Sequence, residues 1–191
     1  MNRRRILRAA GLALLLLLAW LGSGYIGAQR ACAHDPRFAC SPRDAAHAIH
    51  IADPTKSWAF YGRLAPGQHD RYRFHLRRAA SIPWNLLVEQ RDAGDPARPV
   101  ATLTTASGKP IARATLARAQ AFFEPFSGIQ YLSSPPVTLH LAPGSYRIEI
   151  AMQGPGSAQR YVMAIGAQER FGLMEIPYVL GAIYRIKTRG W

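Results

Sequence analysis

Alternation of apolar and polar side chains is the main pattern between residues 57 and 166. It is clearest over 69–77, where Tyr72, Phe74 and Leu76 are separated by polar, mostly basic residues. Because successive side chains of a strand point to opposite faces, this period of two predicts a half-buried strand. The same period, or a weaker form of it, predicts further strands over 57–64, 82–88, 100–105, 111–116, 137–141, 146–150 and 161–165.

Proline and glycine separate these segments. Pro66-Gly67 and Pro143-Gly144 each lie between two strand candidates, where proline presets φ and glycine accepts a positive φ. The stretch 122–132 is aromatic and shows no clear period, so no strand is predicted there, and no long amphipathic helix is predicted between 57 and 166. Many short strands joined by regular turns predict an all-β, antiparallel sandwich.

Three motifs in this region resemble those of bacterial pre-peptidase C-terminal domains and of related GOLD-like sandwiches. In chain order they are Gly67-x-x-Asp70-x-Tyr72-x-Phe74, Leu141-x-x-Gly144-x-Tyr146-x-Ile148-x-Ile150 and Tyr161-x-Met163-x-Ile165. The resemblance implies a jelly-roll-like β-sandwich over 57–166 that binds or presents a partner without catalysis. The glycines also fit ordinary turns and the apolar residues an ordinary core, while Asp70 either caps the turn or contributes to a Ca²⁺ site.

The N-terminus carries the signature of export. Residues 1–8 are basic, and residues 9–28 contain no charged side chain. A helix of about 20 residues matches the ~30 Å hydrocarbon core of a bilayer. We expect residues 1–28 to be a retained signal-anchor in the inner membrane, with the body in the periplasm. The alternative is cleavage near Ala31-Cys32-Ala33 and a free periplasmic protein.

Residues 29–56 are expected to form a linker that contains both cysteines. Cys32 and Cys40 are close in sequence, and an oxidising compartment favours a disulfide between them. Two free thiols are the alternative to the disulfide. A metal site that adds His34 and Asp35 is the weaker interpretation, because the spacing matches no common ligand pattern.

The tail, residues 167–191, differs from the strands that precede it. Pro177 is suited to the first turn of a short helix. The segment is too short and too charged to span a bilayer, and it is either an interfacial segment or a helix packed on the sandwich edge. Its candidate interfacial residues are Tyr184, Arg185, Lys187, Arg189 and Trp191.

Charge adds a candidate surface to this picture. The formal net charge is +13, and 49% of the residues are hydrophobic, which excludes a disordered chain. A basic body is attracted to anionic surfaces. Strand alternation places Arg71, Arg73, His75 and Arg77 on one face, with side chains ~6.5–7 Å apart. This basic stripe either binds phosphate or carboxylate groups or is an ordinary solvated strand face.

No catalytic motif, phosphate loop or paired carboxylate is found, so we predict a protein that is not an enzyme and needs no cofactor. The histidines form no specific metal constellation. The predicted function is a membrane-anchored, extracytoplasmic module that binds or scaffolds an envelope protein or the membrane surface, with no nucleic-acid partner. The alternative is a soluble periplasmic binder of an acidic glycan or a metal ion.

Overall fold

The computed structural model describes residues 35–39, 44, 46–92, 94–124, 127–170 and 176–189. The chain divides into two compact units after Ala31, and all described residues belong to the second. The expected anchor, both cysteines and Trp191 lie outside the described residues. No helix in the described ranges is long and apolar enough to cross a membrane.

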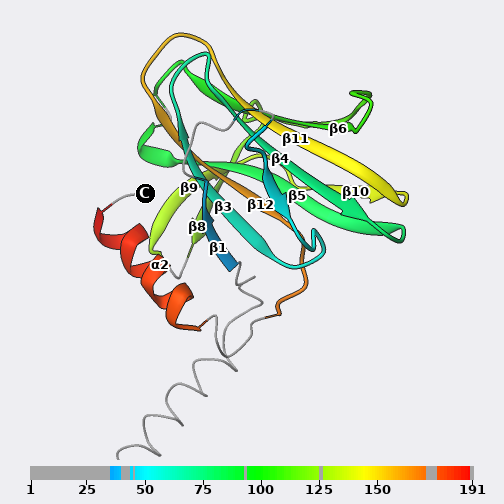
Figure 1. Cartoon of the computed structure of the whole chain (residues 1–191). Coiled ribbons are helices and arrows are strands. Elements are labelled where there is room, and N and C mark those ends of the chain that lie inside the picture. The colour runs from blue at the N-terminus through cyan, green and yellow to red at the C-terminus, as the bar shows by residue number, and fades with distance from the viewer. Residues whose placement is uncertain are drawn as a thin grey trace, which may run out of the picture. The chain divides into compact units, whose positions relative to one another are not determined.

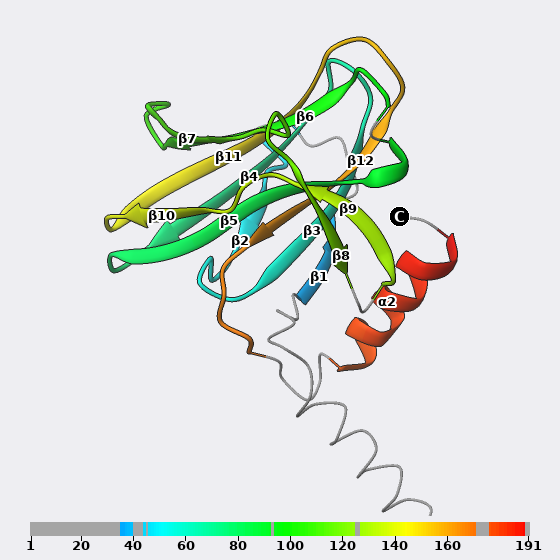
Figure 2. The same cartoon turned by 180° about the vertical axis from the view of Figure 1, so that it is seen from behind.

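Two sheets make up the described unit (Figures 1 and 2). The seven-stranded sheet has the order β1 (Asp35–Phe38), β3 (Trp58–Leu64), β12 (Gln159–Ile165), β5 (Ala80–Glu89), β9 (Ile129–Ser133) and β8 (Gln120–Glu124), with β10 (Val137–Leu141) also paired to β5. The five-stranded sheet has the order β2 (Ile49–Ile51), β4 (His69–Leu76), β11 (Gly144–Gln153), β6 (Arg98–Thr105) and β7 (Pro110–Ala114). A 3₁₀ turn, η1 (Gln90–Asp92), follows β5, and the helix α2 (Ile176–Arg189) ends the described chain.

The main core lies between the two sheets. Tyr72 and Ile148 from the five-stranded sheet and Trp84 and Met163 from the other belong to one cluster of buried side chains. The strand alternation explains this core, because the residues between Tyr72, Phe74 and Leu76 are exposed or half-buried. The all-β sandwich prediction is confirmed, and so is the short C-terminal helix.

The structure departs from a purely antiparallel arrangement at one end. β1 and β2 arise from the segment expected to be a linker, and they pair in parallel with β3 and β4. Both sheets are therefore mixed. β1 contains Pro36 and does not alternate, and the alternation of β2 covers only three residues, which is too short to indicate a strand.

The stretch 122–132, for which no strand was predicted, forms a hairpin of β8 and β9. β8 is an edge strand that pairs only with β9 among the described strands. Phe122 and Phe123 are neighbours on opposite sides of this strand, and both are exposed. Because neither side of β8 is buried in the core, its sequence lacks the period of two.

The outer face of the seven-stranded sheet carries a second, smaller core. Tyr61, Tyr131 and Val162 cluster there with Ile186 of α2, and Phe38 of β1 packs against them. Both faces of β3 and β12 are thus largely buried. The helix expected from Pro177 packs on the sheet through this cluster, beside β1 (Figure 1).

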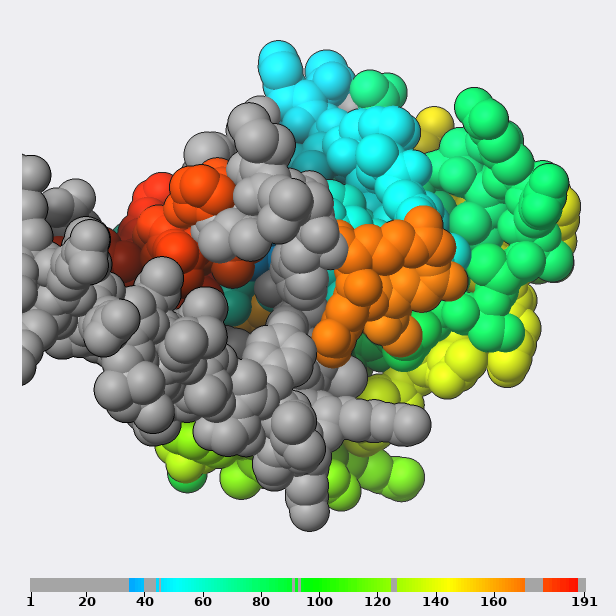
Figure 3. Space-filling model, turned by 90° about the horizontal axis from the view of Figure 1, so that it is seen from below, coloured from blue at the N-terminus to red at the C-terminus, as the bar shows by residue number. Residues whose placement is uncertain are grey.

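Near this end of the sandwich, the segment after β12 closes onto the residues before β3. The amide of Ala167 donates to the Thr55 carbonyl at 3.1 Å, and the amide of Ser57 donates to the Gln168 carbonyl at 3.0 Å. Figure 3 shows this segment, in orange, against the cyan residues. Gly166 makes the bend at φ +81°, where an added Cβ would run into the Lys56 carbonyl.

Candidate functional site

The solvent face of the five-stranded sheet holds a row of polar side chains that crosses four strands. His50 on β2 lies opposite Arg73 on β4, Arg73 lies opposite Arg147 on β11, and Arg147 lies opposite Thr104 on β6. All these positions belong to the face that turns away from the core, since their sequence neighbours Tyr72, Phe74 and Ile148 are buried. We call these four residues, together with His75, the basic row.

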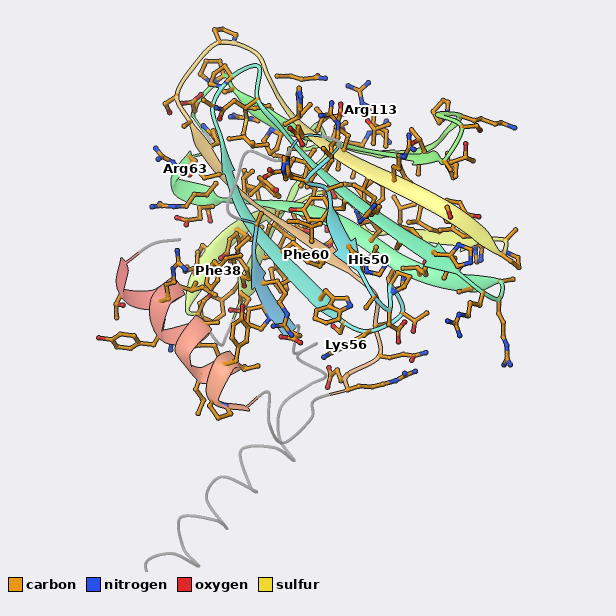
Figure 4. All side chains as sticks on the ribbon, viewed as in Figure 1. Phe38, His50, Lys56, Phe60, Arg63 and Arg113 are labelled. Carbon is orange, nitrogen blue, oxygen red and sulfur yellow. The ribbon has the colours of Figure 1, made fainter. Side chains whose placement is uncertain are left out.

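The carboxylate of Glu149, in the row beside the basic row, already has a cationic partner. Glu149 lies opposite Arg71 in the adjacent row, and Nε of Arg71 donates to Oε2 of Glu149 at 2.7 Å. Arg113, farther along that row, donates weakly to Oε1 of Gln153 at 3.4 Å. Figure 4 shows His50 and Arg113, which come from the two edge strands of this sheet.

Arg73 and Arg147 lack such compensation within the described part of the chain. Both are exposed, and neither takes part in a hydrogen bond or ion pair with another described residue. Like charges directly opposite each other on two strands destabilise a sheet. An anion held between the two guanidinium groups removes that repulsion and satisfies their planar donor forks.

Two open hollows adjoin this pair of arginines. The first, of about 450 Å³, is lined by Arg71, Arg73, Thr102, Thr104, Arg147 and Glu149, among others. The second, of about 520 Å³, lies on the other side of the pair and is lined by His50, His75 and Ser145 as well as by Arg73 and Arg147. The two arginines line both hollows. A ligand in either hollow therefore lies beside both guanidinium groups.

The basic stripe expected from the sequence is divided by the structure. Arg73 and His75 belong to the basic row, with Nδ1 of His75 3.0 Å from Oγ of Ser145. Arg71 is engaged by Glu149, and Arg77 follows the end of β4, where it is exposed and lines neither hollow. No observation tests what the stripe binds, so its role stays a prediction.

Sequence reasoning missed His50 and Arg147. Arg147 alternates with the core residues Tyr146 and Ile148, so its exposure was readable from the pattern. Its position opposite Arg73 depends on which strands pair and in what register, which the pattern of one strand does not contain. His50 lies in the segment expected to be a linker, where no signal marked a strand.

Asp70 has a structural role in this structure. It is fully buried, and the hydroxyl of Tyr161 donates to its Oδ2 at 2.6 Å while also lying 2.7 Å from the Tyr72 hydroxyl. Burial, together with the nearby Tyr72 and Asp70, raises the pKa of Tyr161 well above its usual value. Gly62 lies opposite Tyr161, and a side chain there would overlap the Tyr161 ring.

Metal ligands are not gathered in the part of the chain that the structure describes. No group of three His, Cys, Asp or Glu residues is placed to hold a metal ion there. His47 instead contacts Asp44, with Nδ1 2.8 Å from Oδ1. His34, Cys32 and Cys40 lie outside the described residues, so the predicted disulfide and its metal alternative stay predictions.

A second charged cluster links β1, β3 and α2. Lys56 and Arg37 both donate to Oδ2 of Asp35, at 2.8 and 3.0 Å, and Asp35 is fully buried. The Arg37 guanidinium lies 5.1 Å from the Trp58 ring centroid and 4.6 Å from that of Tyr178. Because both cations donate to the buried Asp35 and the Arg37 guanidinium is covered by two aromatic rings, this cluster is suited to holding the elements together.

No family model matches this chain, and no curated protein matches it. Among solved structures, the chain is similar to the pre-peptidase C-terminal domain of a collagenase from Bacillus anthracis, at 16% identity and a TM-score of 0.42, over 65% of this chain and 97% of that one. It is also similar to a periplasmic inhibitor of g-type lysozyme from Salmonella Typhimurium, at 16% identity and a TM-score of 0.35, over 63% of this chain and 98% of the inhibitor.

A third similarity is to a family GH115 4-O-methyl-alpha-glucuronidase, at 16% identity and a TM-score of 0.32. It covers 58% of this chain and only 14% of the enzyme. The first of these structures is the kind of domain that the sequence motifs resemble. These likenesses concern the fold alone.

Proposed function

We propose that the protein is a non-catalytic binding module whose basic row holds a partner rich in carboxylates. The observation that carries the proposal is the pair formed by Arg73 and Arg147, two exposed arginines placed opposite each other on the same sheet face. Both side chains are exposed to solvent, and Glu149 in the adjacent row is engaged by Arg71. Such a pair is costly to the sheet without an anion and favourable with one.

The shape of the face favours an extended partner over a small ion. Hollows of about 450 and 520 Å³ flank the two arginines, and both are open to solvent. Thr102, Thr104 and Ser145 supply hydroxyl groups in these hollows. Hydroxyls beside guanidinium groups suit two kinds of partner: an acidic glycan, whose sugar rings carry both carboxylates and hydroxyls, and an acidic segment of an envelope protein.

The proposed setting is extracytoplasmic, with residues 9–28 as a retained membrane anchor. Its support is the sequence alone: a basic N-terminus followed by an apolar run without charge. In that setting the five-stranded sheet is available to envelope components, and nucleic acid is not a partner. The jelly-roll-like topology implied by the sequence motifs fits the same role in presenting a sheet face.

Binding of the full-length protein to polygalacturonate and to poly-L-glutamate tests the proposal. Replacing both arginines of the basic row, by Arg73→Thr together with Arg147→Thr, should abolish binding to whichever polymer the wild type prefers. Arg63→Thr is the matched control, because Arg63 is an exposed strand arginine that lies opposite Arg160 on the other sheet. If the wild type prefers polygalacturonate, the partner is a glycan; if it prefers polyglutamate, the partner is a protein. Equal losses of polymer affinity in the control and in the double variant would refute the site.

A further inference from the structure

The helix α2 has an apolar stripe on the side that does not pack on the sheet. Ala182 and Ile186 are buried, each with 4% of its surface exposed. Leu180 and Tyr184, one helical turn apart, are 62% and 63% exposed. At 3.6 residues per turn, Leu180, Tyr184 and Lys187 lie on the side of the helix opposite Ala182 and Ile186. A surface helix ordinarily carries polar residues on that side.

Most of the exposed large apolar side chains of the described unit come from two elements, α2 and the edge strand β8. Of its large hydrophobic residues that are exposed, all but Ile111 come from α2 and β8: Phe122, Phe123, Tyr178, Leu180 and Tyr184. Phe122 is paired with Tyr131, which belongs to the same outer-face cluster as Ile186 of α2. Phe122 therefore points to the side of the sheet on which α2 lies. Phe123, the next residue of β8, points to the other side. Large exposed apolar side chains on one side of a protein, here Phe122, Leu180 and Tyr184, mark an interaction surface.

The charge of α2 selects the partner. The helix contains no acidic residue, and Arg185 and Lys187 lie in its second half. Lys187 is exposed beside Tyr184, and the Arg185 guanidinium covers Phe38 at 4.2 Å from the ring centroid. Aromatic and aliphatic side chains flanked by cations are the pattern of a helix that lies in a membrane interface. An anionic lipid surface offers both an apolar layer and negative charge.

Chain length places this helix within reach of such a surface. α2 contacts β1, and β1 begins at Asp35. Six residues separate Asp35 from the end of the apolar segment 9–28, and the seven Cα-to-Cα steps between the two positions span at most about 25 Å. A domain anchored by residues 9–28 thus carries β1, and α2 beside it, close to the bilayer.

We infer that α2 docks on the anionic membrane surface through Leu180, Tyr184 and Lys187. The inference rests on the proposed anchoring by residues 9–28 and adds a second contact with the bilayer. Docking sets the orientation of the domain on the membrane: α2 and the outer face of the seven-stranded sheet face the lipid. The basic row lies on the outer face of the opposite sheet, where it is available to a partner that is not part of the membrane.

Photocrosslinking of the full-length protein in vesicles tests this inference. The photoreactive residue p-benzoylphenylalanine replaces Tyr184 in one variant and Ile111 in another; Ile111 is the control because it is 41% exposed on β7 of the other sheet. In vesicles that contain phosphatidylglycerol, position 184 should form several-fold more lipid adduct than position 111. Adding Lys187→Glu should lower the adduct at position 184 by about fivefold or more, since each cation near an anionic surface contributes about that factor.

The outcomes separate the docking from the anchoring. If the chain is washed from the vesicles by carbonate, anchoring fails and the docking inference fails with it. If the chain is retained but positions 184 and 111 give equal lipid adducts, the anchor stands and the docking inference is overturned. Crosslinks from position 184 to a second copy of the chain in place of lipid also overturn it, because they assign the stripe to self-association.

Discussion

Replacing Arg147 by threonine should make the domain more stable and its binding weaker. Arg147 lies opposite Arg73, and neither has an anionic partner among the described residues. Cβ atoms of residues opposite each other on two strands are ~4.5–5.5 Å apart; pairs at this spacing act on the scale of about 0.2–1 kcal/mol, and like charges there destabilise the sheet. Coulomb's law agrees, giving about 0.7 kcal/mol for unit charges ~6 Å apart in water. Threonine also has a higher strand propensity than arginine has.

The unfolding free energy of Arg147→Thr should therefore rise by about 0.2–1 kcal/mol, a gain of roughly 1–4 °C in melting temperature for a protein of this size. Its affinity for the preferred acidic polymer should fall. A charge-assisted hydrogen-bonding contact is worth about 1.5–3 kcal/mol, which corresponds to about 10- to 150-fold in Kd. Urea denaturation of the full-length protein measures the first quantity, and titration with the polymer measures the second.

A rise in stability together with a fall in affinity identifies a binding residue, since replacing a residue that serves folding alone lowers the stability of the protein. The control Arg63→Thr has the same change of residue type on the other sheet and should leave polymer affinity unchanged. The reasoning is refuted if Arg147→Thr destabilises the domain by more than about 1 kcal/mol, the usual scale of a structural loss. It is equally refuted if the affinity of Arg147→Thr equals that of the wild type.

Other predictions concern the groups that hold the fold together. Tyr161→Phe removes a buried donor to Asp70 and should lower the unfolding free energy by about 1–3 kcal/mol in urea denaturation; an unchanged midpoint contradicts the role given to this hydrogen bond. Hydrogen bonds from Ser157 and from the Ala97 amide hold the pKa of Asp95 at about 2, below its ordinary 3.8. A depressed pKa stabilises the fold above pH 4 and loses that contribution as the pH falls towards 2, so the stability difference between wild type and Asp95→Asn should shrink over this window; a constant difference argues against it. Ile186→Ala leaves a cavity under α2 and should lower the unfolding free energy by about 2–4 kcal/mol. Proteolysis of the tail should be faster; resistance equal to that of the wild type means that α2 does not depend on this contact.

The sequence was sufficient to predict the strands that face the core on one side only. β4 and β11 alternate because one face of the five-stranded sheet packs on the core and the other meets solvent. The turns at Gly67 and Gly144 were predictable because both glycines adopt positive φ, at 79° and 155°. These features depend on local geometry, which a single sequence records well.

The sequence was insufficient to predict strands that form only because they pair with a segment far away in the chain. β1 and β2 are short and join their sheets by parallel pairing across a loop, so their burial comes from β3 and β4 rather than from their own pattern. The β8–β9 hairpin was missed for a related reason: the apolar side chains of β8 are exposed at a sheet edge. Local periodicity does not mark such strands.

The candidate site also has a part that the sequence predicts and a part that it does not. The pattern of β4 placed Arg73 and His75 on a solvent face, and the structure confirms that exposure. Three other features depend on the register between strands that are far apart in the chain. Arg147 lies opposite Arg73, Glu149 binds Arg71, and His50 lies opposite Arg73 on its other side. The arginine pair, which carries the functional proposal, could not have been identified before the sheet order was known.

Arginine-specific chemical labelling, with and without the preferred acidic polymer, tests the central claim most directly. Each arginine of the full-length protein is labelled by a phenylglyoxal reagent, and peptide mass spectrometry quantifies the modification of each residue. The polymer should protect Arg73 and Arg147 strongly, while Arg63 on the other sheet should react as fast as it does in the free protein. Protection of Arg63 to the same degree, or no protection of Arg73 and Arg147 at saturating polymer, would contradict binding at the basic row.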